Sequence, residues 1–139
     1  MLKLIIGVKG SGKTGKLVDN LNEKAHDHEK NVICIERGRR LDSFVKYNIR
    51  LIDITEYPVT GFDQLLAFIA GINAKDYDVT HIYIDSIFKV AEVETNYEEL
   101  TKFLEACDQL SRDMHFEAHV ILSADVADLP ESVLRYAEQ

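Results

Sequence analysis

The sequence predicts a three-layer α/β domain, in which a five-stranded, mainly parallel sheet lies between two layers of helices. Short apolar runs alternate along the chain with longer stretches in which apolar residues recur every three or four positions. The short runs are typical of buried strands and the longer stretches of amphipathic helices, and their alternation indicates a parallel sheet. A chain of 139 residues suits one hydrophobic core, so we expect a single domain over residues 1–139.

The first half of the chain is expected to contain three strands and two helices. The predicted elements are a strand at 2–7, a helix from Lys13 to about His28, strands at 31–36 and 50–54, and a helix at 60–73. The strand at 50–54 is short, which favours the edge of the sheet, and a further short helix is possible at 41–47. Thr60 and Asp63 have the spacing of a helix-capping box.

The second half is expected to contain two strands and two helices. The predicted elements are a strand at 81–85, a long helix opened by the polar run at 95–98, a strand at 119–123 and a short helix from Pro130. The long helix carries an apolar stripe that is typical of a core-facing side. Its members are Tyr97, Leu100, Phe103, Leu104, Cys107, Leu110 and Met114.

Composition and charge narrow the class of protein. Hydrophobic residues make up 46% of the chain and no apolar run is long enough for a membrane span, so we expect no membrane insertion. The chain begins almost directly with its first strand, and both cysteines lie in core patterns, which favours the cytoplasm. The net charge is −8, but residues 1–16 carry +4. One basic corner on an acidic body suits a free nucleotide and argues against nucleic-acid binding.

Residues 7–14 match the phosphate-binding pattern G-x-x-x-x-G-K-[ST], between the first strand and the first helix. In this context glycines let backbone N–H groups surround phosphate oxygens, and the helix N-terminus adds partial positive charge. Lys13 is expected to reach the β- and γ-phosphates, and the Thr14 hydroxyl to bind Mg²⁺. The predicted nucleotide-binding residues are Gly7, Lys9, Gly10, Ser11, Gly12, Lys13, Thr14 and Gly15. The pattern therefore predicts a P-loop NTPase fold.

An acid is expected at the carboxyl end of a neighbouring strand, where it completes the Mg²⁺ site. Asp85 follows the apolar run at 82–84 and is the predicted second Mg²⁺ ligand, although a strand that ends in an Asp-Ser turn is a common alternative. No glutamate follows Asp85, so we assign the general base to Glu36, at the end of the strand expected beside it. The alternative is that Glu36 is a solvated residue at a strand end.

Residues 32–86 resemble the ATPase core of RecA-type recombinases. That family places its glutamate after the second strand, in an Asp-Ala-Glu-His segment followed by Leu-Asp, and here Glu36-Arg37-Gly38-Arg39-Arg40-Leu41-Asp42 occupies that stretch. A short edge strand, a helix opened by Thr-Gly and a strand ending in Asp-Ser follow in the family's order. The glutamate register is displaced, with Arg37 or Gly38 where the family's carboxylate falls. The chain also looks like small bacterial proteins labelled twitching-motility, or pilus-retraction, ATPases.

The resemblance to RecA-type ATPases implies the order of the strands, the type of nucleotide and one further residue of the site. The last predicted strand is expected between the first strand and the Asp85 strand, a RecA-like order. Ser123 at its end would then sense the γ-phosphate, or else cap the following turn. The resemblance favours adenine over guanine, and RecA-like sites often lie at subunit interfaces, so a homo-oligomer is one option. The family's later strands and DNA-binding loops are missing, which argues against recombination.

Two further groups of residues give weaker signals than the glycine loop. Arg37, Arg39 and Arg40 would serve either as an arginine finger or as solvated surface, and surface is the more frequent role of such a cluster. His81, His115 and His119 show no spacing with acids or cysteines that would indicate a zinc site.

The leading functional prediction is a Mg²⁺-dependent ATPase with ATP or ADP as ligand, in which Lys13, Glu36 and Ser123 serve catalysis and Thr14 and Asp85 hold the metal. We expect slow turnover by the protein alone, because in-trans arginines from a partner or a second copy often supply much of the rate. The alternatives are a non-catalytic switch module that binds an unknown protein partner, and a small-molecule or nucleoside kinase. The kinase is disfavoured because residues 86–94 contain no arginine.

Overall fold

The computed structural model describes residues 1–8, Gly10 and residues 12–137, and it has the predicted α/β fold. Five strands form one sheet in the order β1-β5-β4-β2-β3, and every adjacent pair is parallel. The strands are β1 (Leu2–Gly7), β2 (Val32–Glu36), β3 (Arg50–Asp53), β4 (His81–Ile84) and β5 (Glu117–Ser123). β5 thus separates β1 from β4, and β3 lies at the edge, as the sequence predicts.

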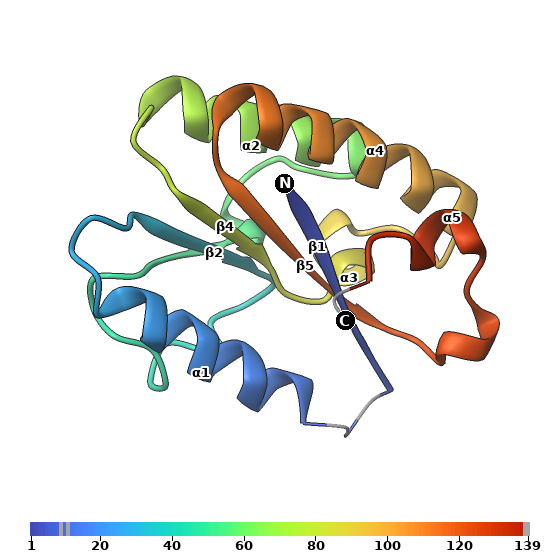
Figure 1. The fold of residues 1–139 in the computed structure, drawn as a ribbon, viewed down its shortest axis with the longest axis horizontal. Coiled ribbons are helices and arrows are strands. Elements are labelled where there is room, and N and C mark those ends of the chain that lie inside the picture. Colours follow the sequence, from blue (N-terminus) through green and yellow to red (C-terminus); the bar gives the residue numbers. More distant parts are fainter. Residues whose placement is uncertain (9, 11, 138–139) are drawn as a thin grey trace.

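Helices cover both faces of the sheet and give the domain its three layers (Figure 1). α1 (Lys13–Ala25) lies on one face, and α2 (Phe62–Lys75) and α4 (Tyr97–Met114) lie together on the other. The shorter helices α3 (Ile87–Ala91) and α5 (Glu131–Leu134) and two 3₁₀ turns, at Ile54–Glu56 and Val126–Asp128, complete the elements. Among the described residues, no helix is long and apolar enough to cross a membrane.

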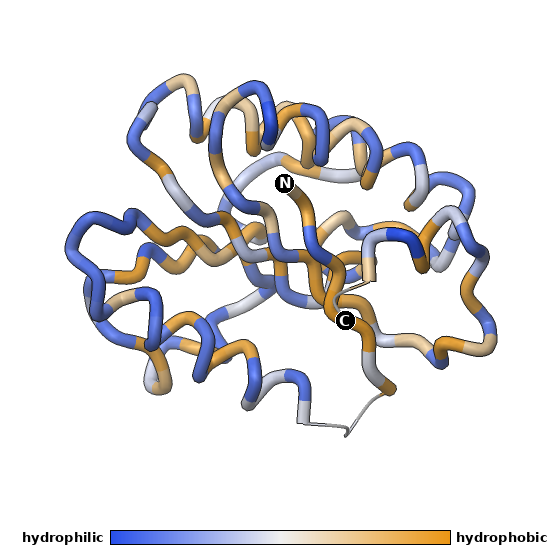
Figure 2. Tube along the Cα trace, viewed as in Figure 1, coloured by the Kyte–Doolittle hydropathy of each residue, from blue (hydrophilic) through white to orange (hydrophobic). Residues whose placement is uncertain are grey.

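The core is divided by the sheet, because alternate residues of each strand point to opposite faces. In β4, for example, Ile82 and Ile84 pack toward α2 and α4, whereas Tyr83 packs toward α1. The α1 face has the smaller cluster, which includes Leu17 and Leu21 of the helix. Figure 2 shows the strands as mostly hydrophobic and the outer turns of the helices as mostly hydrophilic. The amphipathic pattern therefore positions α1 over the middle of the sheet, with its N-terminus at the carboxyl ends of the strands.

The segment 41–47 is not the short helix that the sequence allows, but a series of turns and bends. One backbone hydrogen bond lies within the segment, from Phe44 N to Leu41 O at 2.9 Å, and further bonds join the segment and Asn48 to α1. The Asn22 side chain donates to Phe44 O at 3.0 Å and accepts from Lys46 N at 2.9 Å, and Asn48 Nδ2 donates to Ala25 O at 2.9 Å. These long-range hydrogen bonds replace those that a helix would make internally.

Several helix ends also differ from the prediction. α1 ends at Ala25, three residues early, and α3 is too short for its periodicity to be recognised in the sequence. Gly61, rather than a side chain, caps α2, and Asn96 caps α4 by accepting from Glu99 N at 3.0 Å. Helix ends are the least reliable part of a sequence-based prediction, because several neighbouring polar residues can serve as the cap.

Candidate nucleotide-binding site

The candidate site lies at the carboxyl ends of the strands, where four of the predicted residues meet. In the registers of the parallel pairs, Gly7 at the end of β1 is opposite Ser123 at the end of β5. Ile35 of β2 is likewise opposite Ile84 of β4, so Glu36 and Asp85 follow at equivalent positions. The Asp85 N–H donates to Ile35 O at 2.9 Å, which extends the pairing by one residue. Ligands bind at this edge in open α/β sheets.

The glycine loop connects β1 to α1 with two residues in left-handed conformations. Gly10 has φ +85° and Gly12 has φ +86°, a region that residues with a Cβ atom enter only at a cost. Gly12 is the N-cap of α1, so the free N–H groups of the first helical turn lie beside the loop. Lys9 and Ser11 lie outside the described residues. The loop therefore has a backbone that requires glycine at the two positions described.

Lys13, Thr14 and Gly15 form the first turn of α1, as the pattern requires. Lys13 Nζ donates to the carbonyl of Val8 at 3.3 Å, which holds the ammonium group over the loop. The Thr14 side chain is exposed at the helix start. The first turn contains no acidic residue, so nothing in it offsets the positive end of the helix dipole.

Asp85 is a buried carboxylate at the end of β4, with only 2% of its surface exposed. Its Oδ2 accepts from Arg40 Nη2 at 2.8 Å, and the Ser86 hydroxyl lies 3.4 Å from Oδ1. Ser86 has φ +59°, a left-handed conformation that turns the chain sharply from β4 into α3. Strained backbone of this kind costs on the order of 1–2 kcal/mol and is concentrated at functional sites.

Glu36 is buried at the end of β2, with 1% of its surface exposed, and is not the solvated residue of the alternative interpretation. Its Oε1 accepts from Arg40 N at 3.1 Å, whereas Oε2 has no hydrogen-bond partner among the described residues. Burial raises the pKa of the Glu36 carboxyl above its ordinary value, and hydrogen bonds from the backbone of Leu41 and Arg40 partly offset this effect. The loop 37–41 thus covers a carboxylate whose charge is incompletely compensated.

The three arginines of this loop have different partners, although the sequence treats them as one cluster. Arg37 pairs with Glu92 at 3.2 Å and Arg39 pairs with Glu56 at 2.6 Å, both at the surface. Arg40 alone reaches the site, through Asp85. Gly38 has φ +90° and its N–H donates to Asp53 Oδ1 at 2.8 Å, so the loop turns tightly enough to bring Arg40 back over Glu36. The sequence signal for this role is the glycine between the arginines.

Ser123 ends β5 beside the glycine loop and is exposed. The next residue, Ala124, donates its N–H to Gly7 O at 3.1 Å and so fixes the end of β5 to the start of the loop. This position is compatible with the predicted sensor role, which stays a prediction.

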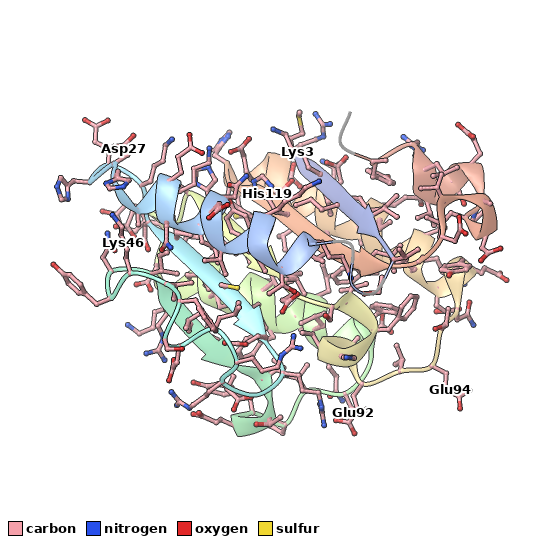
Figure 3. The ribbon with its side chains drawn as sticks, turned by 90° about the horizontal axis from the view of Figure 1, so that it is seen from below. Lys3, Asp27, Lys46, Glu92, Glu94 and His119 are labelled. Atoms are coloured by element: carbon pink, nitrogen blue, oxygen red, sulfur yellow. The ribbon has the colours of Figure 1, made fainter. Side chains whose placement is uncertain are left out.

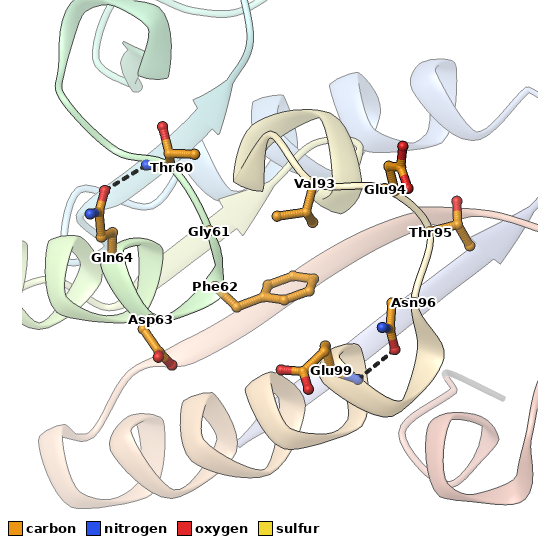
Figure 4. Close-up of a pocket in the computed structure, with 10 residues that line it drawn as sticks. All are labelled: Thr60, Gly61, Phe62, Asp63, Gln64, Val93, Glu94, Thr95, Asn96 and Glu99. Carbon is orange, nitrogen blue, oxygen red and sulfur yellow. Dashed lines mark hydrogen bonds between the residues drawn. The ribbon is translucent and has the colours of Figure 1, made fainter.

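A separate hollow of about 670 Å³ lies between the N-termini of α2 and α4 (Figure 4). Two of its polar side chains serve the local backbone: Gln64 Oε1 accepts from Thr60 N at 2.7 Å, and Asn96 caps α4. Of the predicted nucleotide-binding residues that the structure describes, none lines it. The hollow is therefore separate from the described part of the glycine loop.

A second polar cluster lies at the amino ends of β4 and β5. His81, Glu117 and His119 have possible ligand atoms that all lie within 4.8 Å of one another. The spacing of the histidines along the chain gives no sign of this cluster, because its members meet across two strands. His81 is opposite Glu117 in the register of β4 with β5, and His119 is two residues farther on the same strand.

Comparisons with known proteins support the fold. No family model and no curated protein matches the chain. Among solved structures, a KaiC-like protein from the hyperthermophilic archaeon Pyrococcus horikoshii superposes with a TM-score of 0.73 over 97% of this chain and 68% of that chain, at 17% sequence identity. An identity this low shows the fold alone, and the likeness to twitching-motility ATPases stays a prediction. The chain thus has the RecA-like α/β fold of the KaiC-like protein, with a glycine loop at the carboxyl ends of its strands.

Proposed function

We propose that this protein binds Mg²⁺·ATP at the carboxyl edge of its sheet and hydrolyses it slowly to ADP and phosphate. The observation that carries the proposal is the glycine loop itself: left-handed Gly10 and Gly12 lead from a buried strand into the N-terminus of α1. Such a loop presents backbone N–H groups to phosphate oxygens, and Lys13 adds a positive charge beside them. The RecA-like fold of the solved neighbour agrees with this assignment.

The residues at the site fit a magnesium ion. The Thr14 hydroxyl and the Asp85 carboxylate are oxygen donors, which Mg²⁺ prefers, and they stand at the start of α1 and the end of β4, on the same edge of the sheet. The bound ion would neutralise phosphate charge as the transferred group separates. In the described conformation Arg40 Nη2 binds Asp85 Oδ2 at 2.8 Å, so the guanidinium competes with a metal ion for this carboxylate.

Glu36 is the proposed general base, and its burial explains why turnover would be slow. A base must come within hydrogen-bond distance of the attacking water. The loop 37–41 covers Glu36, and the same loop carries Arg40 to Asp85. Opening of this loop would therefore free the metal ligand and expose the base together. A protein partner or a second copy of the chain that displaces the loop would accelerate hydrolysis.

A nucleotide-dependent switch is the second candidate, and the Arg40–Asp85 ion pair favours it. If nucleotide binding breaks this pair without uncovering Glu36, the loop would report the bound state to a partner and hydrolysis would be negligible. The two candidates share the binding site and differ only in phosphate release.

The test is Mg²⁺-dependent phosphate release from ATP by the wild type across protein concentrations, together with nucleotide binding by calorimetry. Lys13→Ala is the loop variant, and Lys16→Ala is the matched control, because it removes the same charge from an exposed position one turn farther along α1. The ATPase proposal expects release from wild type and Lys16→Ala and loss in Lys13→Ala. Tight binding without release would favour the switch, and equal ATP binding by all three proteins would overturn both candidates.

A further inference from the structure

The amino ends of β4 and β5 bring together two histidines and a glutamate on the α1 face of the sheet. His81 is the first residue of β4 and is opposite Glu117, the first residue of β5. Glu117 and His119 are two residues apart, so their side chains leave β5 on the same face. His81 Nε2 lies 2.7 Å from Glu117 Oε2, and the rings of His81 and His119 are 6.0 Å apart between centroids. Figure 3 marks His119 and Lys3, which are neighbours in the register of β1 with β5.

His119 is the residue that calls for an explanation. Only 3% of its surface is exposed, yet neither ring nitrogen has a hydrogen-bond partner among the described residues. The Tyr83 ring stacks on it at 4.4 Å, which accounts for the packing of the ring but not for its two nitrogens. Buried polar atoms without partners are rare in folded proteins, and a bound ion or water is among the groups that satisfy them.

His81 has the outer partner that metal-binding histidines usually have. Its Nδ1 lies 2.9 Å from Thr80 Oγ1, and Thr80 Oγ1 donates to Asn31 O at 3.1 Å while it accepts from Asn31 N at 2.9 Å. The hydroxyl retains a lone pair for an Nδ1–H of His81. A proton on Nδ1 leaves Nε2 free to bind a metal, and this kind of support for a ligating imidazole is common.

Glu117 gives the cluster a negatively charged carboxylate and a side that is open to solvent. Its side chain is 39% exposed, so the cluster is open to solvent on one side. Its other oxygen, Oε1, lies 3.7 Å from Lys3 Nζ in a partly exposed pair, and Oε2 faces the histidines, in contact with His81 Nε2. Metal–ligand bonds of about 2.0–2.2 Å place neighbouring ligand atoms of a tetrahedral ion roughly 3.3 Å apart. Small rotations of the exposed glutamate and of His81 therefore bring the three ligands to bonding distance.

We propose that His81, Glu117 and His119 bind a divalent transition-metal ion, with Zn²⁺ as the best match and water as the fourth ligand. Two imidazoles and one carboxylate suit Zn²⁺, Fe²⁺ or Co²⁺ and disfavour Mg²⁺, which prefers oxygen ligands. The site is thus chemically distinct from the Mg²⁺ site proposed at the other edge of the sheet. A bound ion would join β4 to β5 at the ends opposite Asp85 and Ser123. This inference does not depend on the proposed ATPase activity.

Zinc binding to the purified full chain tests the proposal, by equilibrium dialysis against micromolar Zn²⁺ in the presence of millimolar Mg²⁺. The wild type is expected to retain one Zn²⁺ per chain. Glu117→Gln, which keeps the size of an exposed side chain, and His119→Gln are each expected to weaken binding at least tenfold. His28→Ala removes an exposed histidine outside the cluster and is the matched control, with wild-type affinity expected.

A Co²⁺ titration identifies the ligands independently. Visible absorption of a four- or five-coordinate Co²⁺ complex, without sulfur-to-metal charge transfer, is expected for the wild type and not for Glu117→Gln. Circular dichroism of each variant distinguishes loss of the site from loss of the fold, and Glu117→Gln is the informative variant if His119→Gln does not fold. A wild type that retains no Zn²⁺, or a folded Glu117→Gln that binds Zn²⁺ as tightly as the wild type, would overturn the proposal.

Discussion

The two edges of the sheet carry polar clusters that are stabilised in different ways. At the carboxyl edge, the buried carboxylates of Asp85 and Glu36 are held by Arg40, through its guanidinium and its backbone N–H. At the amino edge, His81 and Glu117 are paired, but the buried His119 has no hydrogen-bond partner among the described residues. Among the described residues, each edge therefore has buried polar atoms without a partner, Glu36 Oε2 at the carboxyl edge and the two ring nitrogens of His119 at the amino edge. The edges differ in access, because the loop 37–41 covers Glu36 and Asp85, whereas the side chain of Glu117 is 39% exposed. Our two proposals follow this difference: a site that opens when the loop moves, and a site that is completed by an ion.

The largest effect is expected from Asp85→Asn, which removes the negative charge at the carboxyl edge. We expect Mg²⁺-dependent ATP hydrolysis to fall by about a hundredfold or more, as is typical when a charged group that acts on the transition state is lost. Steady-state phosphate release measures the effect. Asp113→Asn, at an exposed position near the end of α4, is the control with unchanged activity. A decrease of less than threefold in Asp85→Asn would exclude this carboxylate as the metal ligand.

The two edges can be compared directly by measuring how each ligand stabilises a variant of its own site and a variant of the other site. A ligand at a hundred times its dissociation constant stabilises the folded state by about 2.7 kcal/mol. Zn²⁺ is therefore expected to raise the Tm of wild type and Lys13→Ala but not of Glu117→Gln. Mg²⁺·ATP is expected to raise the Tm of wild type and Glu117→Gln but not of Lys13→Ala. Thermal unfolding with each ligand measures both effects, and any variant that loses both responses would show that the edges are not independent.

Glu36→Gln is expected to separate stability from activity at the carboxyl edge. Because burial raises the folded-state pKa of Glu36, the wild type loses stability as pH rises from the unfolded-state value of about 4.5 to the higher folded-state value. The substituted amide does not carry this charge, so the variant should be more stable at pH 7 by about 1 kcal/mol, with the gain vanishing near pH 4. Urea unfolding at both pH values measures the difference.

The activity of the same variant tests the assignment of the base. Loss of hydrolysis with retained ATP binding is expected if Glu36 activates water. Unchanged hydrolysis by Glu36→Gln would mean that Glu36 only supports the loop 37–41. Lower stability of the variant at pH 7 would mean that the charge of the Glu36 carboxylate is compensated in solution.

The fold was largely predictable because its signals are local. Apolar runs predict all five strands to within two residues at either end, and the resemblance to RecA-type ATPases predicts that β5 lies between β1 and β4. The segment 41–47 was not predictable, because Phe44 and Lys46 form hydrogen bonds with the distant side chain of Asn22 in α1. Local propensity does not contain such contacts.

The candidate sites also differ in how far their residues could be predicted from local sequence signals. The glycine loop is contiguous in the chain, so its residues were named directly, and the meeting of Glu36 with Asp85 followed from the strand order. The position of Arg40 depends on the turn at Gly38, and the histidine cluster depends on the register of β4 with β5. The expected strand order predicts which strand ends lie side by side, but it does not predict the exact register of two strands or the path of a tight turn.

The smallest effect is expected from Arg40→Ala, which tests whether the loop 37–41 competes with the metal. Arg40 is half-exposed, so its ion pair with Asp85 contributes on the order of 1 kcal/mol, equivalent to about a fivefold change in an equilibrium constant. Without it, Asp85 is free, and Mg²⁺·ADP should bind up to about fivefold more tightly by calorimetry. Arg39→Ala, whose guanidinium pairs with Glu56 at the surface, should bind as the wild type does. Weaker binding in Arg40→Ala alone would instead make Arg40 a ligand of the nucleotide phosphates, and the loop a part of the closed site rather than its competitor.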